Sequence, residues 1–375
     1  MLEKDIVRSR PREFIADGYA SKDMAHVYTS GTTGMPTELW WSKESMTAYY
    51  ALREARIRHR FGTTVDEPWA ILGGRVVAPV EQARPPFWVW NRALHQLYLS
   101  SYHLSCDNIP SYLAALRRYG VTHIYAYTSS LVAFANGILA TDEQRMGMKV
   151  AITNAEPLLG HQRSLISNVF ECPVCETYGM AEGVAAASEC PEGHLHLWPE
   201  VGYLEVQQMD RHVSVSGSGD LICTAMLRIE MPLIRYRVGD CASISSGETS
   251  CSCGSRLPVM GSILGRTDDI LYTRDGRWIG RLDPVFKGDL AIKEAQIVQE
   301  NLGTVRVLVV PDAGYSENAG VEIADRLRAR MGPLHVQLEE VNYIPREPNG
   351  KFRAVVCNVS AKELSEAGVR HIART

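Results

Sequence analysis

Short apolar runs alternate with segments whose apolar residues recur at helical spacing, and this alternation limits the fold more than any other feature. Strands are predicted for residues 121–127 and 150–153, and helices that cover them are predicted for residues 111–119 and 129–140. A compact strand, helix and strand unit is predicted for residues 305–310, 319–331 and 335–341. The pattern is typical of the α/β class, with a large N-terminal domain of mixed sheets and helices and a small C-terminal α+β domain.

The boundary between these domains is expected near Asp268. The segment 265–269 (GRTDD) interrupts the apolar pattern with a glycine and a cluster of charges. This places the large domain at residues 1–267 and the small domain at residues 268–375.

Composition excludes several classes of function. With 39 basic and 43 acidic residues the formal net charge is -4, which argues against nucleic acid or anionic lipid as the main partner. The sequence has no apolar run of the roughly 18 residues that a membrane-spanning helix needs, and its acidic start is unlike a signal peptide. Nine cysteines, an odd number without a regular framework, favour thiols or a metal site over disulfides. We therefore expect a cytoplasmic protein.

A loop rich in glycine and hydroxyl groups lies near the start, between a short apolar segment and a helix expected to begin near Ser42. Backbone amides and hydroxyls in such a loop can surround phosphate oxygens. The loop lacks the Gly-Lys-Ser/Thr ending of the P-loop, so that motif's lysine and magnesium roles do not apply. A plain Gly-Thr turn is the alternative. The candidate phosphate ligands are Thr29, Ser30, Gly31, Thr32, Thr33 and Gly34.

Four more motifs follow the loop in order: 176–182 (ETYGMAE), 236–240 (YRVGD), 265–268 (GRTD) and 345–353 (PREPNGKFR). Together the five motifs resemble the adenylate-forming superfamily of acyl-CoA synthetases, adenylation domains and luciferases. The resemblance covers residues 28–353 and is strongest to the phenylacetate-CoA ligase branch and its short relatives. It rests there on Thr37, where most members have lysine, and on the segments 154–158 (NAEPL) and 268–271 (DDIL).

The resemblance implies a binding site for ATP and Mg²⁺. It assigns Glu182 to the magnesium ion and Tyr178, with Gly179, to the adenine ring. Any one of these residues alone would also fit a purely structural role. The other wall of the nucleotide pocket is implied to be Ala155, Glu156 and Pro157.

The C-terminal motifs imply ribose, hinge and catalytic residues. Asp240 is expected to end a strand over residues 230–238 and to accept both ribose hydroxyls, although a turn aspartate is the simpler alternative. Arg266 is implied to contact ribose or phosphate, and Asp268 to act as the hinge of the small domain. Lys351 is the implied catalytic residue, whose ammonium neutralises charge on the acyl and α-phosphate oxygens.

A structural zinc site is also predicted. Three thiolates and one imidazole, from Cys190, His196, Cys251 and Cys253, satisfy a tetrahedral zinc ion. The phenylacetate-CoA ligase branch has a similar arrangement. His194 is a reserve ligand, whereas Cys175 is expected to be a buried apolar residue on the strand that leads to Tyr178.

The expected activity is ATP- and Mg²⁺-dependent activation of a carboxylic acid as an acyl-AMP. Aromatic residues in segments 84–90 and 125–127 favour an aromatic acid, and the short relatives suggest a phenazine carboxylic acid; core packing would also explain these rings. The acceptor is open among CoA, a carrier protein, an amine and a partner reductase. Because few residues precede the phosphate loop, the large domain is expected to be shortened and to be completed by a homodimer. The alternatives are an adenylyltransferase that modifies a cofactor hydroxyl and a degenerate nucleotide-binding subunit.

Overall fold

The chain forms two compact units, which are described separately. The computed structural model describes residues 1–29, 37–79, 82–141, 143–208, 211–245, 251–266, 271–274, 278–279, 283–286, 290–346 and 352–367. The second unit comprises residues 218–221, 239–243 and 262–375, and the first comprises the remainder. The proposed domain boundary at residue 268 lies outside the described residues.

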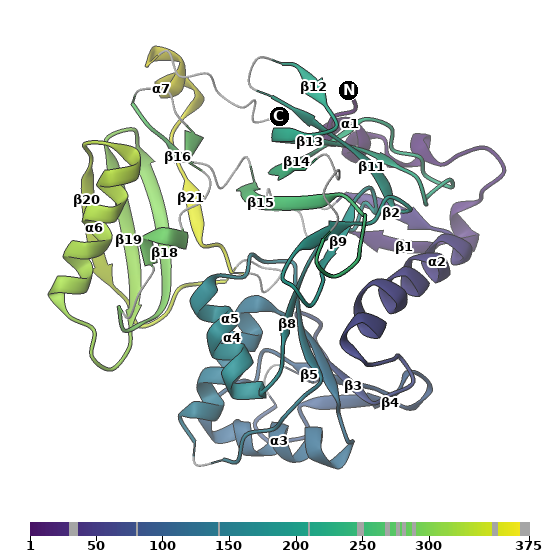
Figure 1. The fold of residues 1–375 in the computed structure, drawn as a ribbon, viewed down its shortest axis with the longest axis horizontal. Helices are drawn as coiled ribbons and strands as arrows, with labels where there is room; N and C mark the ends of the chain where they lie inside the picture. The colour runs from purple at the N-terminus through teal and green to yellow at the C-terminus, as the bar shows by residue number, and fades with distance from the viewer. Residues whose placement is uncertain are drawn as a thin grey trace. The chain divides into compact units, whose positions relative to one another are not determined.

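Five parallel strands in the first unit form the framework of the candidate site (Figure 1). Their order is β5-β3-β6-β7-β8, with β4 antiparallel at the outer edge. The strands are short and strongly apolar, as expected for strands covered on both faces. Their bounds are β3 (Trp69–Gly73), β4 (Trp88–Asn91), β5 (Gln96–Ser100), β6 (His123–Tyr127), β7 (Val150–Asn154) and β8 (Val174–Gly179).

Helices cover both faces of these strands. One face packs against α3 (Ile109–Arg118), α4 (Thr128–Leu139) and α5 (Gly160–Phe170), which share one buried core with it. The other face packs against α2 (Lys43–Arg53), which Ser42 caps by accepting a hydrogen bond from the Ser45 amide at 3.1 Å.

The sheet continues into antiparallel strands in the order β12-β11-β13-β14-β15-β10-β9-β8. A separate hairpin, β1 with β2, precedes α2, and the N-terminal helix α1 (Lys4–Ser9) follows a bridge from Leu2 to Tyr236. The bounds are β1 (Ala25–Tyr28), β2 (Glu38–Trp41), β9 (Ala186–Glu189), β10 (Leu195–Leu197), β11 (Gly202–Gln207), β12 (Val213–Ser214), β13 (Gly217–Ala225), β14 (Tyr236–Ile244) and β15 (Val259–Arg266).

The second unit has its own four-stranded sheet, in the order β20-β19-β18-β21, and its own apolar core. Its main helix is capped by Ser316, which accepts a hydrogen bond from the Ala319 amide at 3.4 Å. The bounds are β16 (Leu271–Tyr272), β17 (Trp278–Ile279), β18 (Ile292–Asn301), β19 (Thr304–Pro311), α6 (Glu317–Met331), β20 (His335–Glu340), β21 (Val355–Cys357) and α7 (Ala361–Glu366).

The α/β class and the smaller C-terminal sheet and helix unit are confirmed. The strand expected over residues 230–238 is wrong, because β14 begins only at Tyr236 and continues to Ile244. Glu230 is instead held in a buried polar cluster, and Pro232 has no amide to donate to a ladder. Asp240 therefore lies inside a strand and does not end one. Over the ranges that the structure describes, no helix is both long and apolar enough to cross a membrane.

Candidate active site

The carboxyl ends of the parallel strands form the candidate site. Numbered by their order in the chain, the five parallel strands lie in the sheet as second, first, third, fourth and fifth. The chain thus adds β5 on one side of β3 and the later strands on the other side, so the strand order reverses between β3 and β6. Ligands of open α/β sheets bind in the crevice at such a reversal, outside the carboxyl ends of the strands. The topology thus indicates where a ligand should bind before any side chain is considered.

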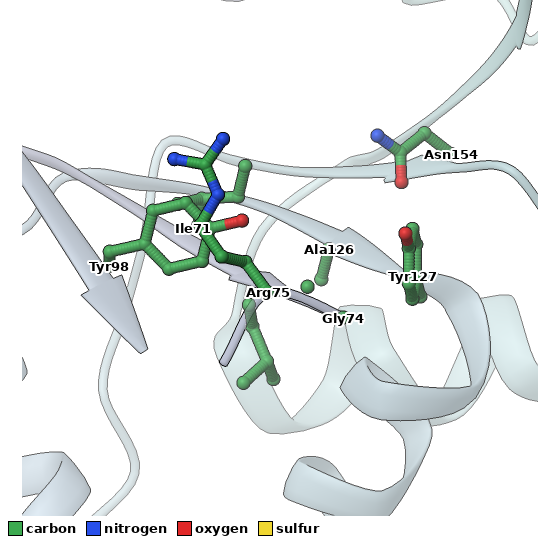
Figure 2. Close-up of a pocket in the computed structure, with 9 residues that line it drawn as sticks. Ile71, Gly74, Arg75, Tyr98, Ala126, Tyr127 and Asn154 are labelled. Atoms are coloured by element: carbon green, nitrogen blue, oxygen red, sulfur yellow. The ribbon is translucent and has the colours of Figure 1, made fainter. Parts of the chain in front are cut away.

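A pocket of about 330 Å³ lies at this reversal (Figure 2). This volume is at the small end of the range for ligand pockets, which starts at roughly 300 Å³. Aliphatic side chains, two tyrosines, an amide and a guanidinium surround it. The lining residues are Ile71, Leu72, Gly73, Gly74, Arg75, Tyr98, Ala126, Tyr127 and Asn154.

The two pocket tyrosines are protonated hydrogen-bond donors at neutral pH. Burial raises the pKa of Tyr98, although the Arg75 guanidinium acts in the opposite direction. Burial, followed by the charge of neighbouring groups that include Tyr98 and Glu156, raises the pKa of Tyr127. The pocket therefore offers hydroxyl donors on a wall whose surface is about half polar and half apolar.

The predicted adenine residues lie at the adjacent strand ends. Thr153 of β7 pairs with Glu176 of β8, so Ala155, which directly follows β7, is level with Tyr178, which is still within β8. Ala155 has a φ of 64°, which is unusual for alanine, and strained residues of this kind concentrate at functional sites. Tyr178 is half-buried, and Gly179 and Pro157 are exposed beside it.

Glu156 has a structural contact that the sequence did not indicate. Its carboxylate accepts hydrogen bonds from the backbone amide of Ser129 at 2.6 Å and from the Ser129 hydroxyl at 3.0 Å. Ser129 is in the first turn of α4, where free amides and the helix dipole favour an acidic group. Glu156 thus connects the segment after β7 to the start of α4, the helix that directly follows β6 at the pocket.

The described residues define the base of the predicted phosphate loop. Thr29 is buried; its amide donates to the Thr37 carbonyl at 3.0 Å, and its hydroxyl accepts from the Thr37 amide at 2.9 Å. The strands β1 and β2 thus bring the two ends of the loop together. Residues 30–36, including Ser30 to Gly34, lie outside the described residues.

Glu182 is the predicted magnesium ligand, and it is 5% exposed. Its Oε1 accepts a hydrogen bond from the Tyr236 hydroxyl at 3.1 Å and lies 3.3 Å from the Lys4 ammonium. The next residue, Gly183, has a φ of 61°, and a Cβ there would lie 2.5 Å from the Trp41 ring. A glycine is therefore required for the loop that holds Glu182.

A buried ion pair supports this loop, and sequence reasoning missed it. Arg228 and Glu230 are both fully buried, with Nε and Oε1 3.5 Å apart. Arg228 donates to the backbone carbonyls of Glu182 and Trp40. Burial lowers the pKa of Arg228 to about 10, against the stabilising charge of Glu230. The pair fixes the backbone from which the Glu182 carboxylate projects.

The C-terminal motifs lie only partly within the described residues. Asp240 is half-buried in β14 and follows Gly239, which has a φ of 81°. Arg266 is the last residue of β15. Asp268 and Lys351 lie outside the described residues.

The aromatic segments have different environments. Phe87 is fully buried, Trp88 makes an edge contact with Tyr112, and Trp90 stacks on Tyr119. Among the aromatic residues of these two segments, only Tyr127 lines the pocket. Core packing, the alternative left open for these rings, accounts for Phe87 and the two tryptophans.

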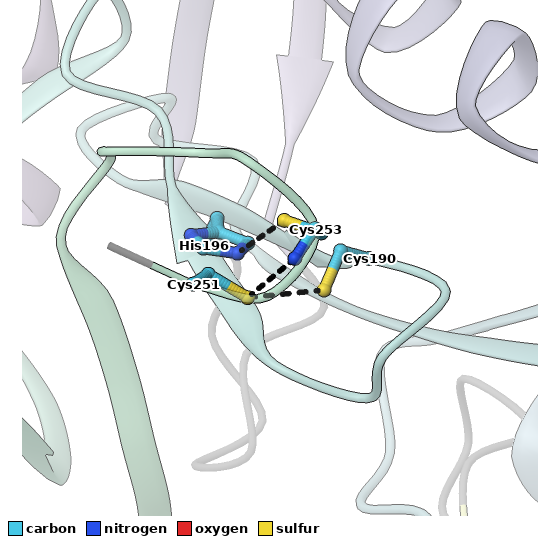
Figure 3. Close-up of side chains that lie close together, drawn as sticks. All are labelled: Cys190, His196, Cys251 and Cys253. Carbon is cyan, nitrogen blue, oxygen red and sulfur yellow. Dashed lines mark hydrogen bonds between the residues drawn. The ribbon is translucent and has the colours of Figure 1, made fainter. Parts of the chain in front are cut away.

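The four predicted zinc ligands lie together (Figure 3), with all ligand atoms within 4.8 Å of one another. Cys190 directly follows β9, His196 is in β10, and Cys251 and Cys253 lie in the segment before β15. The sulfurs of Cys190 and Cys251 are 3.9 Å apart, and the Cys253 sulfur is 3.4 Å from His196 Nε2. Metal bonds of about 2.3 Å give a tetrahedron with edges of about 3.8 Å, so the spacing suits zinc.

Two further features fit a metal. His196 Nδ1 lies 3.2 Å from the Leu257 carbonyl, which directs Nε2 toward the thiols, as is usual for metal-bound histidine. His194, the reserve ligand, lies with Nδ1 3.2 Å from the Cys251 sulfur and outside the four-residue cluster. The prediction for Cys175 is confirmed, since it is fully buried in β8.

Comparison with known proteins agrees with this geometry. A family model described as the CapK C-terminal domain matches residues 271–358. Protein CapK of Staphylococcus aureus is 26% identical over 364 residues, which cover 96% of this chain and 79% of the relative. A phenylacetate-coenzyme A ligase of Thermus thermophilus is 30% identical over 137 residues, 35% of this chain and 30% of that enzyme. The structure of a 2-hydroxyisobutyryl-CoA ligase in complex with R3-HIB-AMP aligns with a TM-score of 0.72 at 16% identity, over 98% of this chain and 81% of that chain.

The fold is thus that of the adenylate-forming CoA ligases. The sequence is also similar to phenylacetate-coenzyme A ligases, the branch that its motifs resemble.

Proposed function

We propose that the protein activates a small aromatic carboxylic acid as an acyl-AMP. The observation that carries this proposal is that three features follow one another along one edge of the sheet. They are the acid-sized pocket, the strained Ala155 and the predicted adenine residue Tyr178. A carboxylate oxygen of the acid attacks the α-phosphorus of ATP, the bond to the bridging oxygen breaks, and pyrophosphate leaves. The site must therefore balance negative charge on both sides of the phosphorus.

Each residue has a part in this step. The loop that starts at Thr29 binds the β- and γ-phosphates, and Asp240 and Arg266 bind the ribose. Mg²⁺, when bound, neutralises phosphate charge; one carboxylate from Glu182 with phosphate and water oxygens is a ligand set that suits it. Lys351 neutralises the charge that develops on the acyl and α-phosphate oxygens. Asp268 is the proposed hinge between residues 1–267 and 268–375.

The proposed acid has a single aromatic ring. Tyr98 and Tyr127 give the pocket aromatic walls, and a cavity at the small end of the usual range favours one ring over three. A phenazine carboxylic acid, expected from the short relatives, is the larger alternative that the same assay tests.

Exchange of labelled pyrophosphate into ATP tests the proposal. We expect acid-dependent exchange with at least one member of a panel of aromatic acids that includes phenazine-1-carboxylate. Lys351→Ala should abolish exchange while nucleotide still binds. An absence of exchange with every acid refutes the proposal; a stable adenylylated alcohol would favour hydroxyl adenylylation, and nucleotide binding without turnover would favour a degenerate subunit.

CoA is the proposed acceptor, because the relatives and structural neighbours named above include CoA ligases. Its thiol would attack the acyl carbon and release AMP. Thioester formed only with a carrier protein, an amide, or a product that requires a reductase would identify the other acceptors. We also propose a homodimer, which light scattering would measure.

We also propose that Cys190, His196, Cys251 and Cys253 bind one structural zinc ion. Partial desolvation raises the pKa of Cys253, but hydrogen bonds from the Ser255 backbone and neighbouring groups outweigh it and leave the pKa below its ordinary value. A thiol that ionises readily is a good zinc ligand. Metal analysis of the purified protein should find one zinc ion per chain.

A further inference from the structure

The pocket has a cationic edge that acid activation alone does not require. Arg75 follows Gly73 and Gly74 at the end of β3, and its guanidinium lies 5.5 Å from the centroid of the Tyr98 ring (Figure 2). Among the described residues, no carboxylate lies within ion-pair distance of Arg75. By contrast Arg58 and Arg163, which flank the same sheet, pair with glutamates at 3.1 and 2.7 Å. Within that part of the chain, Arg75 therefore keeps a positive charge that a ligand can pair.

The opposite side of the pocket carries an unsatisfied polar atom. The amide oxygen of Asn154 is buried and has no hydrogen-bond partner in the described part of the chain. Figure 2 shows this oxygen directed toward the Tyr127 hydroxyl. Leaving a buried acceptor unpaired costs free energy, so a bound molecule or water should supply its partner. The pocket is thus built for a polar ligand at both of its sides.

The order of the strands sets the direction in which an acid would lie. The proposed adenylate site is at the ends of β7 and β8, whereas Arg75 follows β3, two strands away from β7. Adjacent strands are about 4.8 Å apart, so the two positions are separated by roughly 10 Å. An acid whose reacting carboxylate faces β7 and β8 would extend toward Arg75 with its other end.

We propose that the acid carries a second anionic group, and that Arg75 binds this group at the pocket edge opposite the reacting carboxylate. The inference rests on the proposed function for the direction of the acid. A guanidinium binds a carboxylate with two parallel hydrogen bonds, and it can do so while stacked on Tyr98. Arg75 is then a specificity-determining residue, and the substrate class is an aromatic dicarboxylate.

Matched acids test this inference. Phenylacetate, 4-carboxyphenylacetate and 4-carbamoylphenylacetate differ only in the group at the far end, and benzoate, terephthalate and 4-carbamoylbenzoate form a shorter series. Direct calorimetric binding and pyrophosphate exchange are both measured, with the full chain and Mg²⁺-ATP present. We expect the dicarboxylate of at least one series to bind roughly tenfold more tightly than its amide, the effect of one exposed charge-assisted contact.

Variants separate this role from a general loss of activity. Arg75→Gln should remove the preference for the dicarboxylate over its amide, and Arg75→Lys should restore part of it. Arg92→Gln, which removes an exposed positive charge after β4, should leave the preference intact.

Three results would overturn the inference. The first is equal binding of the dicarboxylate and the amide in both series, and the second is no binding of any acid. The third is an equal loss for all acids in Arg75→Gln, which would mean that Arg75 serves the reacting carboxylate. If instead Arg75-dependent selective binding occurs without any exchange, the inference stands and the proposed adenylation fails.

Discussion

Removal of Glu230 should destabilise the first unit far more than removal of an exposed glutamate. Glu230→Ala leaves the fully buried Arg228 without its counter-ion. It also leaves the Ser42 amide and Ser45 hydroxyl without the carboxylate to which they donate at 3.1 and 2.7 Å. The perturbation thus affects β2, the start of α2 and the Glu182 loop together.

The magnitude follows from this burial. Breaking a buried pair costs about 3–5 kcal/mol because an uncompensated charge remains inside, and each lost hydrogen bond adds about 1 kcal/mol when its partner cannot reach water. We expect the free energy of unfolding to fall by roughly 5–7 kcal/mol. The control is Glu143→Ala, because Glu143 pairs with Arg117 and these side chains are 31% and 41% exposed. That change should cost less than about 1 kcal/mol.

Urea unfolding followed by tryptophan fluorescence measures both variants, since all the tryptophans except Trp278 fall in the first unit. The double variant Arg228→Met/Glu230→Leu should be more stable than Glu230→Ala, because it leaves no unpaired charge. If Glu230→Ala changes the unfolding free energy no more than Glu143→Ala does, the buried pair does not hold the Glu182 loop as argued.

Three other predictions concern metal, pH and magnesium. Cys253→Ser should lose the zinc found by metal analysis and lower the thermal midpoint, whereas Cys106→Ser, at an exposed cysteine outside the cluster, should keep both; zinc retained by Cys253→Ser would contradict the site. Burial, then the nearby Arg58 charge, lowers the pKa of His123 to about 3. Because the unfolded chain binds that proton near pH 6.5 and the folded chain does not, the contribution of neutral His123 to stability is complete above that pH and falls by about 2 kcal/mol by pH 5. The difference in unfolding free energy between wild type and His123→Gln should therefore change from pH 7 to 5, and an unchanged difference would contradict this prediction. Lys4→Met should lower the Mg²⁺ concentration needed for nucleotide binding, measured by fluorescence of a labelled ATP, because Lys4 competes for Glu182; an unchanged requirement would show that it does not.

The sequence was most informative where periodicity and capping residues agree. Ser42 was correctly predicted as the point at which α2 begins, and the alternation of strands and helices gave the class. Local pattern failed at residues 230–235, because Glu230 is held by an ion pair with Arg228 that forms only in the folded chain. No residue in that segment is adjacent in sequence to the Glu182 loop that it supports.

The site was predicted in part. Motif resemblance predicts Glu182 as the magnesium ligand, and residue type alone indicates the four metal-ligand candidates that the folded chain brings together. Arg75 and Tyr98 were missed, because their strands β3 and β5 lie next to each other only through a crossover. The Gly73-Gly74 pair at the end of an apolar run was the available signal, since such a turn often allows a ligand to approach the backbone.

Transfer of an oxygen atom tests the central claim most directly. The protein is incubated with Mg²⁺-ATP, hydroxylamine and an activated acid whose carboxylate carries ¹⁸O, and the AMP is examined by mass spectrometry. Attack by the carboxylate on the α-phosphorus, followed by cleavage of the acyl carbon to oxygen bond, predicts one ¹⁸O atom in the AMP. AMP that forms without the label would show that the carboxylate never bonded to the phosphorus.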